Sequence, residues 1–207
     1  MDGDLTIAEK NGKINNEVML NPNEHFDTAK RMAAYENATR LLVQRAQSAT
    51  MPDGFKPKYD TGNMVMQFRA AFKSPELRSK VLASKYEAQR IQSARFSAGF
   101  CGVASYTWGH LFRMPDGQPI WNARQVVDLD GVPNHVWLEN VYDGQILDLT
   151  FDQFVDGRGT IIEYPYDLGQ PASLDITFRR GFVFGNYIGV DLEMIALINR
   201  LNLRDLK

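Results

Sequence analysis

Three side-chain types that cooperate in nucleophilic catalysis follow one another in this chain: Cys101, His135 and Asp148. A thiol attacks a carbonyl carbon as its thiolate, an imidazole can take up the thiol proton, and a carboxylate can orient the imidazole. His135 follows Cys101 by 34 residues and precedes Asp148 by 13. Each type alone is common in structural positions, so it is their order and spacing that predict a Cys-His-Asp site.

The only cysteine of the chain lies in GFCGVASYTWGHLF, residues 99–112, where a helix is predicted to begin. A helix N-terminus presents unpaired N–H groups that stabilise an anion such as a thiolate. Gly99 and Gly102 allow the backbone to turn sharply and a substrate to approach closely. The stretch therefore favours an activated thiol, and the alternative is a buried structural cysteine.

The stretch NHVWLENVYDGQILDLTFDQF resembles the His/Asp half of the transglutaminase-like branch of the papain-like cysteine enzymes. Members of that branch typically read His-x-Trp, a short hairpin, and then a strand that ends in Asp-x-Thr. His135 and Trp137 match the first element, and Asp148 and Thr150 match the second. GFCGVAS resembles the nucleophile element, so the resemblance covers roughly residues 97–155.

The resemblance implies that Cys101 is the nucleophile, His135 the general base and acid, and Asp148 the group that orients the imidazole. It also implies an oxyanion hole, made of the Cys101 backbone N–H and a side chain shortly before the cysteine. Gln92 and Gln89 are the nearest glutamines upstream. The sequence departs from the branch at residue 149, a leucine where many members have proline.

Trp137 and Trp108 are candidates for an aromatic substrate cleft that would exclude water and favour transfer to an amine. Tryptophans in these positions are equally compatible with a place in the core.

The Asp143-Gly144 dipeptide between two apolar runs predicts a hairpin with a two-residue turn. In that register His135 faces Asp152, and Asp148 lies four positions away, about 13 Å along the strand. That separation is too long for a hydrogen bond.

Two alternatives follow from this register. Either the turn is longer or bulged, with its centre near residues 141–142, or Asp152 replaces Asp148 as the partner of His135. We expect Asp148, because it matches the motif and because bulges are common beside active sites.

Composition excludes several other classes of protein. The chain has 207 residues, a net charge of −2 and ordinary globular composition. The three histidines are scattered, so we expect no metal site, and no Gly-rich phosphate-binding motif indicates a nucleotide cofactor. Short mixtures of arginine and aromatic residues do not indicate nucleic-acid binding. The partner we expect is a protein or peptide substrate.

The polar N-terminal stretch lacks the apolar segment of a Sec signal peptide, and no apolar run is long enough to span a membrane. We therefore expect no membrane association, and a cytoplasmic protein or one exported without a Sec signal.

The elements that must position these residues are helices in the first half and strands in the second. Periodicity and capping signals predict helices over residues 21–47, 64–72, 74–96 and from 101 to about 112, with a closing helix over 191–203. Alternation and turn signals predict strands over residues 124–129, 134–142, 145–151, 160–164 and 176–188.

The order of these elements predicts an α+β fold, with the nucleophile helix packed on an antiparallel sheet. The resemblance specifies this as a papain/transglutaminase-like core over residues 97–207, preceded by a helical N-terminal extension or subdomain over residues 1–96.

Two functions from different classes are compatible with this sequence. The first is a cysteine hydrolase or acyltransferase that forms a thioester, with a cysteine protease, a glutamine deamidase and a transglutaminase as subclasses. The second is a catalytically inactive transglutaminase-like scaffold that binds other proteins. A small core with a private helical extension also resembles bacterial effectors.

Overall fold

The computed structural model describes residues 27–82, 91, 94–155, 160–172 and 196–201. Its elements are helices and a four-stranded antiparallel sheet, which confirms the predicted α+β class. Gln92, Gln89 and the predicted strand over residues 176–188 lie outside the described residues. Of the predicted closing helix, residues 196–200 are described and are helical.

The helices of the first half begin at side chains that cap them. They are α2 (Thr28–Ser48), α3 (Thr61–Phe72) and α4 (Pro75–Val81). The side chains of Asp27, Asp60 and Ser74 accept the backbone N–H three residues later, the usual bond of an N-cap. In α3 this cap starts the helix at residue 61, three residues before the predicted start.

The predicted continuous helix over residues 74–96 is wrong, because α4 ends at Val81 and Leu82 has extended backbone. The buried Arg78 donates to the carbonyl oxygens of Phe72 and Phe96, at 2.7 Å each. A straight helix would place residue 96 about 27 Å along the axis from residue 78. The chain instead turns back before residue 96, and this return brings the segment before the cysteine next to α3.

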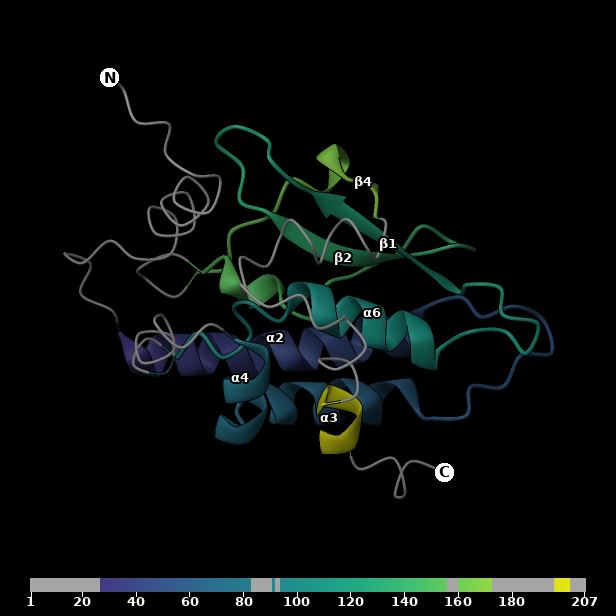
Figure 1. The fold of residues 1–207 in the computed structure, drawn as a ribbon, viewed down its shortest axis with the longest axis horizontal. Coiled ribbons are helices and arrows are strands. Elements are labelled where there is room, and N and C mark those ends of the chain that lie inside the picture. Colours follow the sequence, from purple (N-terminus) through teal and green to yellow (C-terminus); the bar gives the residue numbers. More distant parts are fainter. Residues whose placement is uncertain (1–26, 83–90, 92–93, 156–159, 173–195, 202–207) are drawn as a thin grey trace.

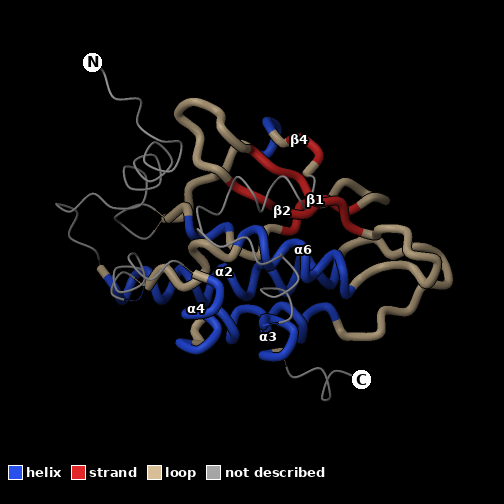
Figure 2. The backbone as a smooth tube through the Cα atoms, in the orientation of Figure 1, coloured by secondary structure: helices blue, strands red, loops and turns tan. Residues whose placement is uncertain are grey.

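The sheet has the order β3-β2-β1-β4. Its strands are β1 (Trp121–Val126), β2 (His135–Asn140), β3 (Ile146–Leu147) and β4 (Gln170–Pro171). Figure 2 shows that the helices α2, α3, α4 and α6 gather on one side of this sheet. The central pair β1 and β2 runs from Trp121 opposite Asn140 to Val126 opposite His135.

The outer strands differ most from the predictions. The strand predicted over residues 145–151 keeps only β3, after which the chain enters the short 3-10 helix η2 (Phe151–Gln153). The strand predicted over residues 160–164 is a single bridge between Val155 and Ile161. A second 3-10 helix, η3 (Tyr166–Leu168), leads into β4.

The turn between β2 and β3 holds four residues, 141–144, so the predicted two-residue turn is wrong. Leu138 faces Leu147 and Glu139 faces Ile146, a register shifted by two residues. The turn is centred between residues 142 and 143, one position beyond the centre predicted for a longer turn.

Side chains that bond backbone N–H groups explain this longer turn. The Asn140 side-chain oxygen accepts the N–H groups of Tyr142 and Asp143, at 2.8 and 3.3 Å. The Asp143 carboxylate accepts the N–H groups of Thr50 and Gln145, at 2.8 and 2.9 Å. The local bonds hold the four-residue turn, and the bond from Thr50 ties it to the loop after α2.

Helix α6 (Cys101–Leu111) lies between the sheet and the other helices (Figure 1). It packs on β1 and β2, and residues 102–108 are all buried. A helix that is apolar on all sides belongs in the interior. The start of α6 is therefore held against the sheet at the end where β2 begins with His135.

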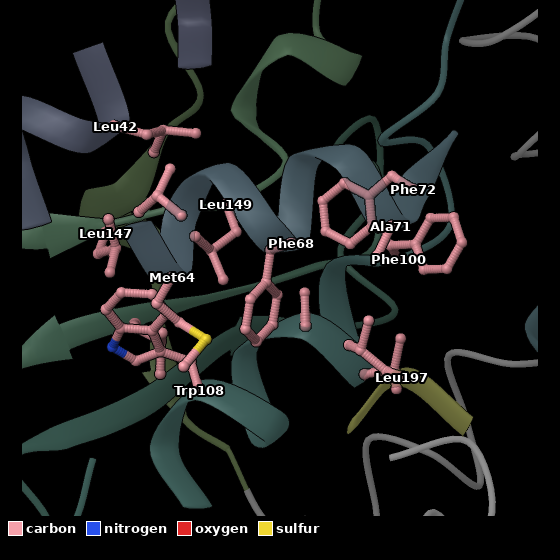
Figure 3. Packing of buried hydrophobic residues seen from close by; sticks show 14 of the residues in the cluster. Leu42, Met64, Phe68, Ala71, Phe72, Phe100, Trp108, Leu147, Leu149 and Leu197 are labelled. Carbon is pink, nitrogen blue, oxygen red and sulfur yellow. The ribbon is translucent and has the colours of Figure 1, made fainter. Parts of the chain in front are cut away.

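The core around α6 contains side chains from both halves of the chain. Trp108 of α6 packs edge-on against Phe68 of α3, with ring centroids 5.8 Å apart, and Phe72 of α3 stacks on Phe100. Figure 3 shows these rings together with Leu149, which follows β3. The helices before residue 97 thus share one core with the segment that carries the site.

Candidate active site

Cys101 is the first residue of α6 and its side chain is partly exposed. Gly99 has a φ of 88°, a left-handed conformation that favours glycine, and it turns the chain into the helix. No side chain caps this helix start. Its first N–H groups therefore have no side-chain cap, and the start of such a helix stabilises negative charge.

His135 and Asp148 form a buried pair, with Nε2 of the imidazole 2.6 Å from Oδ2 of the carboxylate. Both side chains are almost completely buried. The other carboxylate oxygen, Oδ1, accepts the backbone N–H of Thr150 at 2.9 Å and its hydroxyl at 3.1 Å. The Asp-x-Thr motif therefore fixes the carboxylate in the orientation that it presents to the imidazole.

The four-residue turn explains why Asp148 reaches His135. Extending the β2–β3 register sets Asp148 opposite Trp137, on the same face of the sheet as His135 and two positions away. Two positions correspond to about 7 Å along a strand. The bend of the chain after β3 and the lengths of the two side chains close that remaining distance.

Opposing effects set the pKa of His135. Burial lowers it, whereas the Asp148 carboxylate, through its charge and its hydrogen bond, raises it, and the net pKa is about 9. A hydrogen bond with Cys101 and the charge of that residue raise it further. The imidazole therefore interacts with the carboxylate on one side and the thiol on the other.

Asp152, the alternative partner of His135, is instead paired with the buried guanidinium of Arg69. The same guanidinium donates to the Leu149 carbonyl at 3.1 Å and lies 3.6 Å from the centre of the Tyr35 ring. Residues 151–153 form a 3-10 helix rather than a continuation of β3, so Asp152 is directed toward α3. Its contacts anchor the segment after Asp148.

Trp137 and Trp108 do not line an open cleft, because both are fully buried. Trp108 packs in the core between Phe112 and Trp121, with ring centroids at 4.3 and 6.3 Å. Trp137 lies against His135, nearly parallel to its ring, with centroids 5.9 Å apart. Trp137 supports the imidazole from behind rather than contacting a substrate.

Further aromatic rings around His135 were not identified from the sequence. Phe154 and Tyr164 each lie with their ring centroids 4.8 Å from the imidazole. The Tyr166 hydroxyl donates to Oδ2 of Asp148 at 3.1 Å, and because burial raises the pKa of Tyr166, this hydroxyl keeps its proton. Phe154 ends the quoted motif segment, and Tyr164 and Tyr166 follow it just before and at the start of the short helix η3; none of them belongs to a periodic pattern that could reveal it.

Gln153 was also missed, although it lies in the quoted motif segment. Its Nε2 is 2.9 Å from Nδ1 of His135 and 3.4 Å from Oγ1 of Thr150. The 3-10 helix η2 turns this side chain back toward the imidazole. The predicted strand ends at residue 151, so no prediction covered the direction of this side chain.

Among the described residues, no group of His, Cys, Asp and Glu side chains is arranged to hold a metal ion. In the same part of the chain, no helix combines the length and the apolar character needed to cross a membrane. Comparison with protein-family models, curated proteins and solved structures finds no match to this chain.

Proposed function

We propose that this protein is a cysteine-dependent acyl-transfer enzyme that acts on protein or peptide amides through Cys101, His135 and Asp148. One observation carries the proposal: a buried imidazole is bonded to a carboxylate at 2.6 Å and also interacts with the thiol at a helix N-terminus. A structural cysteine does not require this combination of groups.

Each group has a step in the proposed reaction. His135 takes the proton of the Cys101 thiol, and the thiolate attacks the carbonyl carbon of the amide. The Cys101 N–H stabilises the oxyanion that forms. The intermediate then collapses to a thioester, and the imidazolium returns the proton to the amine as it leaves. Water or a second amine, deprotonated by His135, releases the acyl group.

The acceptor of the acyl group distinguishes the possible subclasses. Transfer to water gives a peptidase, or a deamidase where the amide is a glutamine side chain, and transfer to an amine gives a transglutaminase. The resemblance of the His-x-Trp and Asp-x-Thr elements supports a papain/transglutaminase-like core. A bacterial effector would act on a protein substrate outside the cell that produces it, and the same chemistry would serve that role.

The first experiment measures alkylation of the native protein by iodoacetamide from pH 5 to 9. An ordinary thiol reacts appreciably only near its pKa of about 8.5. We expect Cys101 to react readily at pH 6, and His135→Ala to lose this reactivity while it remains folded by circular dichroism. Resistance at all pH values until the protein unfolds would contradict the proposal and favour a binding scaffold.

The second experiment identifies the acceptor by mass spectrometry of candidate proteins after incubation. Deamidation adds about 1 Da, transglutamination removes about 17 Da and joins two chains, and proteolysis gives fragments, as the mass balance of acyl transfer requires. Cys101→Ala should abolish the change, and a product that persists with this variant would arise from another source.

A further inference from the structure

The side chains around Asp148 form a closed ring of hydrogen bonds. His135 Nε2 bonds Oδ2 of Asp148, and Thr150 Oγ1 donates to Oδ1 of the same carboxylate. Gln153 Nε2 bridges the remaining gap, between Thr150 Oγ1 and His135 Nδ1. The carboxylate only accepts, so its two bonds come from His135 and Thr150, and the Gln153 amide nitrogen donates to Thr150; the direction of its bond to Nδ1 depends on the form of the imidazole.

The ring selects one form of the imidazole. The carboxylate requires a proton on Nε2, and the Thr150 hydroxyl gives its only proton to Asp148 and so accepts from the Gln153 amide. The second hydrogen of the amide nitrogen then points to Nδ1, which must be the unprotonated nitrogen. Within the neutral imidazole, which gives way to the imidazolium below the pKa of about 9, these bonds therefore select the tautomer with a lone pair on Nδ1.

Nδ1 is also the nitrogen left for Cys101, because Nε2 is bonded to Asp148. We propose that Gln153 is a positioning residue that holds His135 as the neutral tautomer able to accept the thiol proton, and that releases Nδ1 when the proton arrives. The role of Cys101 in this inference rests on the proposed function, whereas the hydrogen bonds of Gln153 are observed independently of it.

A role for Gln153 as an oxyanion-hole donor fits less well. Both hydrogens of the amide nitrogen are committed, one to Thr150 and one to His135. An oxyanion donor needs an N–H group directed at the substrate.

Other charged and titratable groups near the imidazole act in defined ways. Asp148 and Cys101 raise the pKa of His135. Tyr164 contacts the ring, and the Tyr166 hydroxyl bonds the carboxylate. The Arg69–Asp152 pair lies on the far side of the segment that carries Gln153. Of these groups Cys101 is the one that can bond Nδ1, and the Cys101→Ala background of the test removes it, so none of the other groups replaces Gln153 at that nitrogen.

The test titrates His135 by NMR in a Cys101→Ala background, which removes the coupled thiol and requires no activity. Gln153→Met should raise the pKa of His135 by about 0.5 to 1, the effect of one neutral hydrogen bond on the uncharged form. Gln153→Glu should raise it more, because a carboxylate accepts from protonated Nδ1. Gln118→Met and Gln118→Glu, at an exposed glutamine, are matched controls that should change nothing.

An unchanged pKa in Gln153→Met would show that the amide has only a structural role, and a lowered pKa would show that it accepts from Nδ1; either result overturns the proposal. With Cys101 restored, Gln153→Met should speed alkylation at pH 6 several-fold. The reason is that the amide no longer stabilises the neutral imidazole relative to the imidazolium–thiolate pair. If the pKa shifts as expected but the thiol stays inert in every variant, the proposed function fails and the role of Gln153 in holding the tautomer stands.

Discussion

At the scale of single residues, the pair formed by His135 and Asp148 dominates the electrostatics of the site. Burial alone would favour neutral imidazole, and the carboxylate at 2.6 Å outweighs that effect. The imidazole is thus more basic in the folded protein than in the unfolded chain, and this difference links the stability of the fold to pH.

The direction of the linkage follows from the raised pKa. The folded pKa is about 9 and the ordinary value is 6.5, so the folded state binds the proton more tightly between these values. The stabilisation is complete below pH 6.5 and is lost as pH rises through 9. We expect the free energy of unfolding in urea to fall by up to about 3 kcal/mol across this window. His135→Gln should lack the decrease, whereas His110→Gln should retain it.

The two neighbouring aspartates should have separable roles. Asp148→Asn removes the charge that favours the imidazolium–thiolate pair, so alkylation of Cys101 at pH 6 should slow at least about tenfold, one step in pKa. Asp152→Asn should leave the pH profile of alkylation in place and lower stability instead, because Arg69 loses its partner. The reverse pattern would show that Asp152 orients His135.

At the scale of elements, the tight approach of η3 and β4 to β2 keeps Trp137 behind His135. A Cβ added at Gly169 would lie 2.3 Å from Cζ2 of Trp137 and 3.0 Å from the Tyr166 carbonyl oxygen. The indole is fully buried and cannot move away without displacing its neighbours.

We therefore expect Gly169→Ala to lower the free energy of unfolding by about 1 to 3 kcal/mol, as overpacking of a core does. The matched control is Gly109→Ala in α6, where the added Cβ meets only the Trp121 carbonyl oxygen at 3.9 Å. That change should be neutral or stabilising, since alanine favours helix. Urea denaturation compares the two, and equal effects would contradict the packing argument.

The elements also show which signals the sequence carries. The cap at Ser74 and strand β2 follow from local patterns, and these predictions hold. The caps at Asp27 and Asp60 were not predicted, and β1 begins three residues before its prediction. The short β3, the bend after it and β4 depend on contacts with distant segments, such as the bond from Thr50 to the Asp143 side chain. Periodic patterns within a short stretch of sequence do not reveal such long-range contacts.

The residues of the candidate site likewise divide into those that the sequence predicts and those that depend on distant contacts. The proximity of His135 and Asp148 was expected from residue types and a motif, although the turn proposed from Asp143-Gly144 set them too far apart. The neighbours of the pair come from irregular backbone after β3, where the direction of a side chain depends on tertiary packing. Gln153 and Tyr166 could not be recognised without it.

At the scale of the whole molecule, Arg69 joins the N-terminal helices to the segment that follows Asp148. Its guanidinium bonds Asp152, the Leu149 carbonyl and the Tyr35 carbonyl in the interior, and Thr39 at a partly buried position. The helices before residue 97 therefore support the site through a buried ionic contact as well as through the shared core.

Removing one partner of this ion pair should cost more than removing both. We expect Arg69→Met to lower the free energy of unfolding by about 3 to 5 kcal/mol, because a carboxylate remains buried without its partner. Arg69→Met combined with Asp152→Leu should recover part of that loss, as a double-mutant cycle in urea can measure. Purely additive losses would show that the pair does not couple these regions.

The contrast between a partly exposed thiol and an enclosed imidazole makes the site chemically one-sided. Diethyl pyrocarbonate, which acylates accessible imidazoles, should modify the exposed His110 long before His135. We therefore expect a covalent inhibitor to react at the Cys101 sulfur rather than at the imidazole. Footprinting of His135 then becomes a gauge of fold integrity, because rapid labelling there requires the Phe154 and Tyr164 rings to have separated from it.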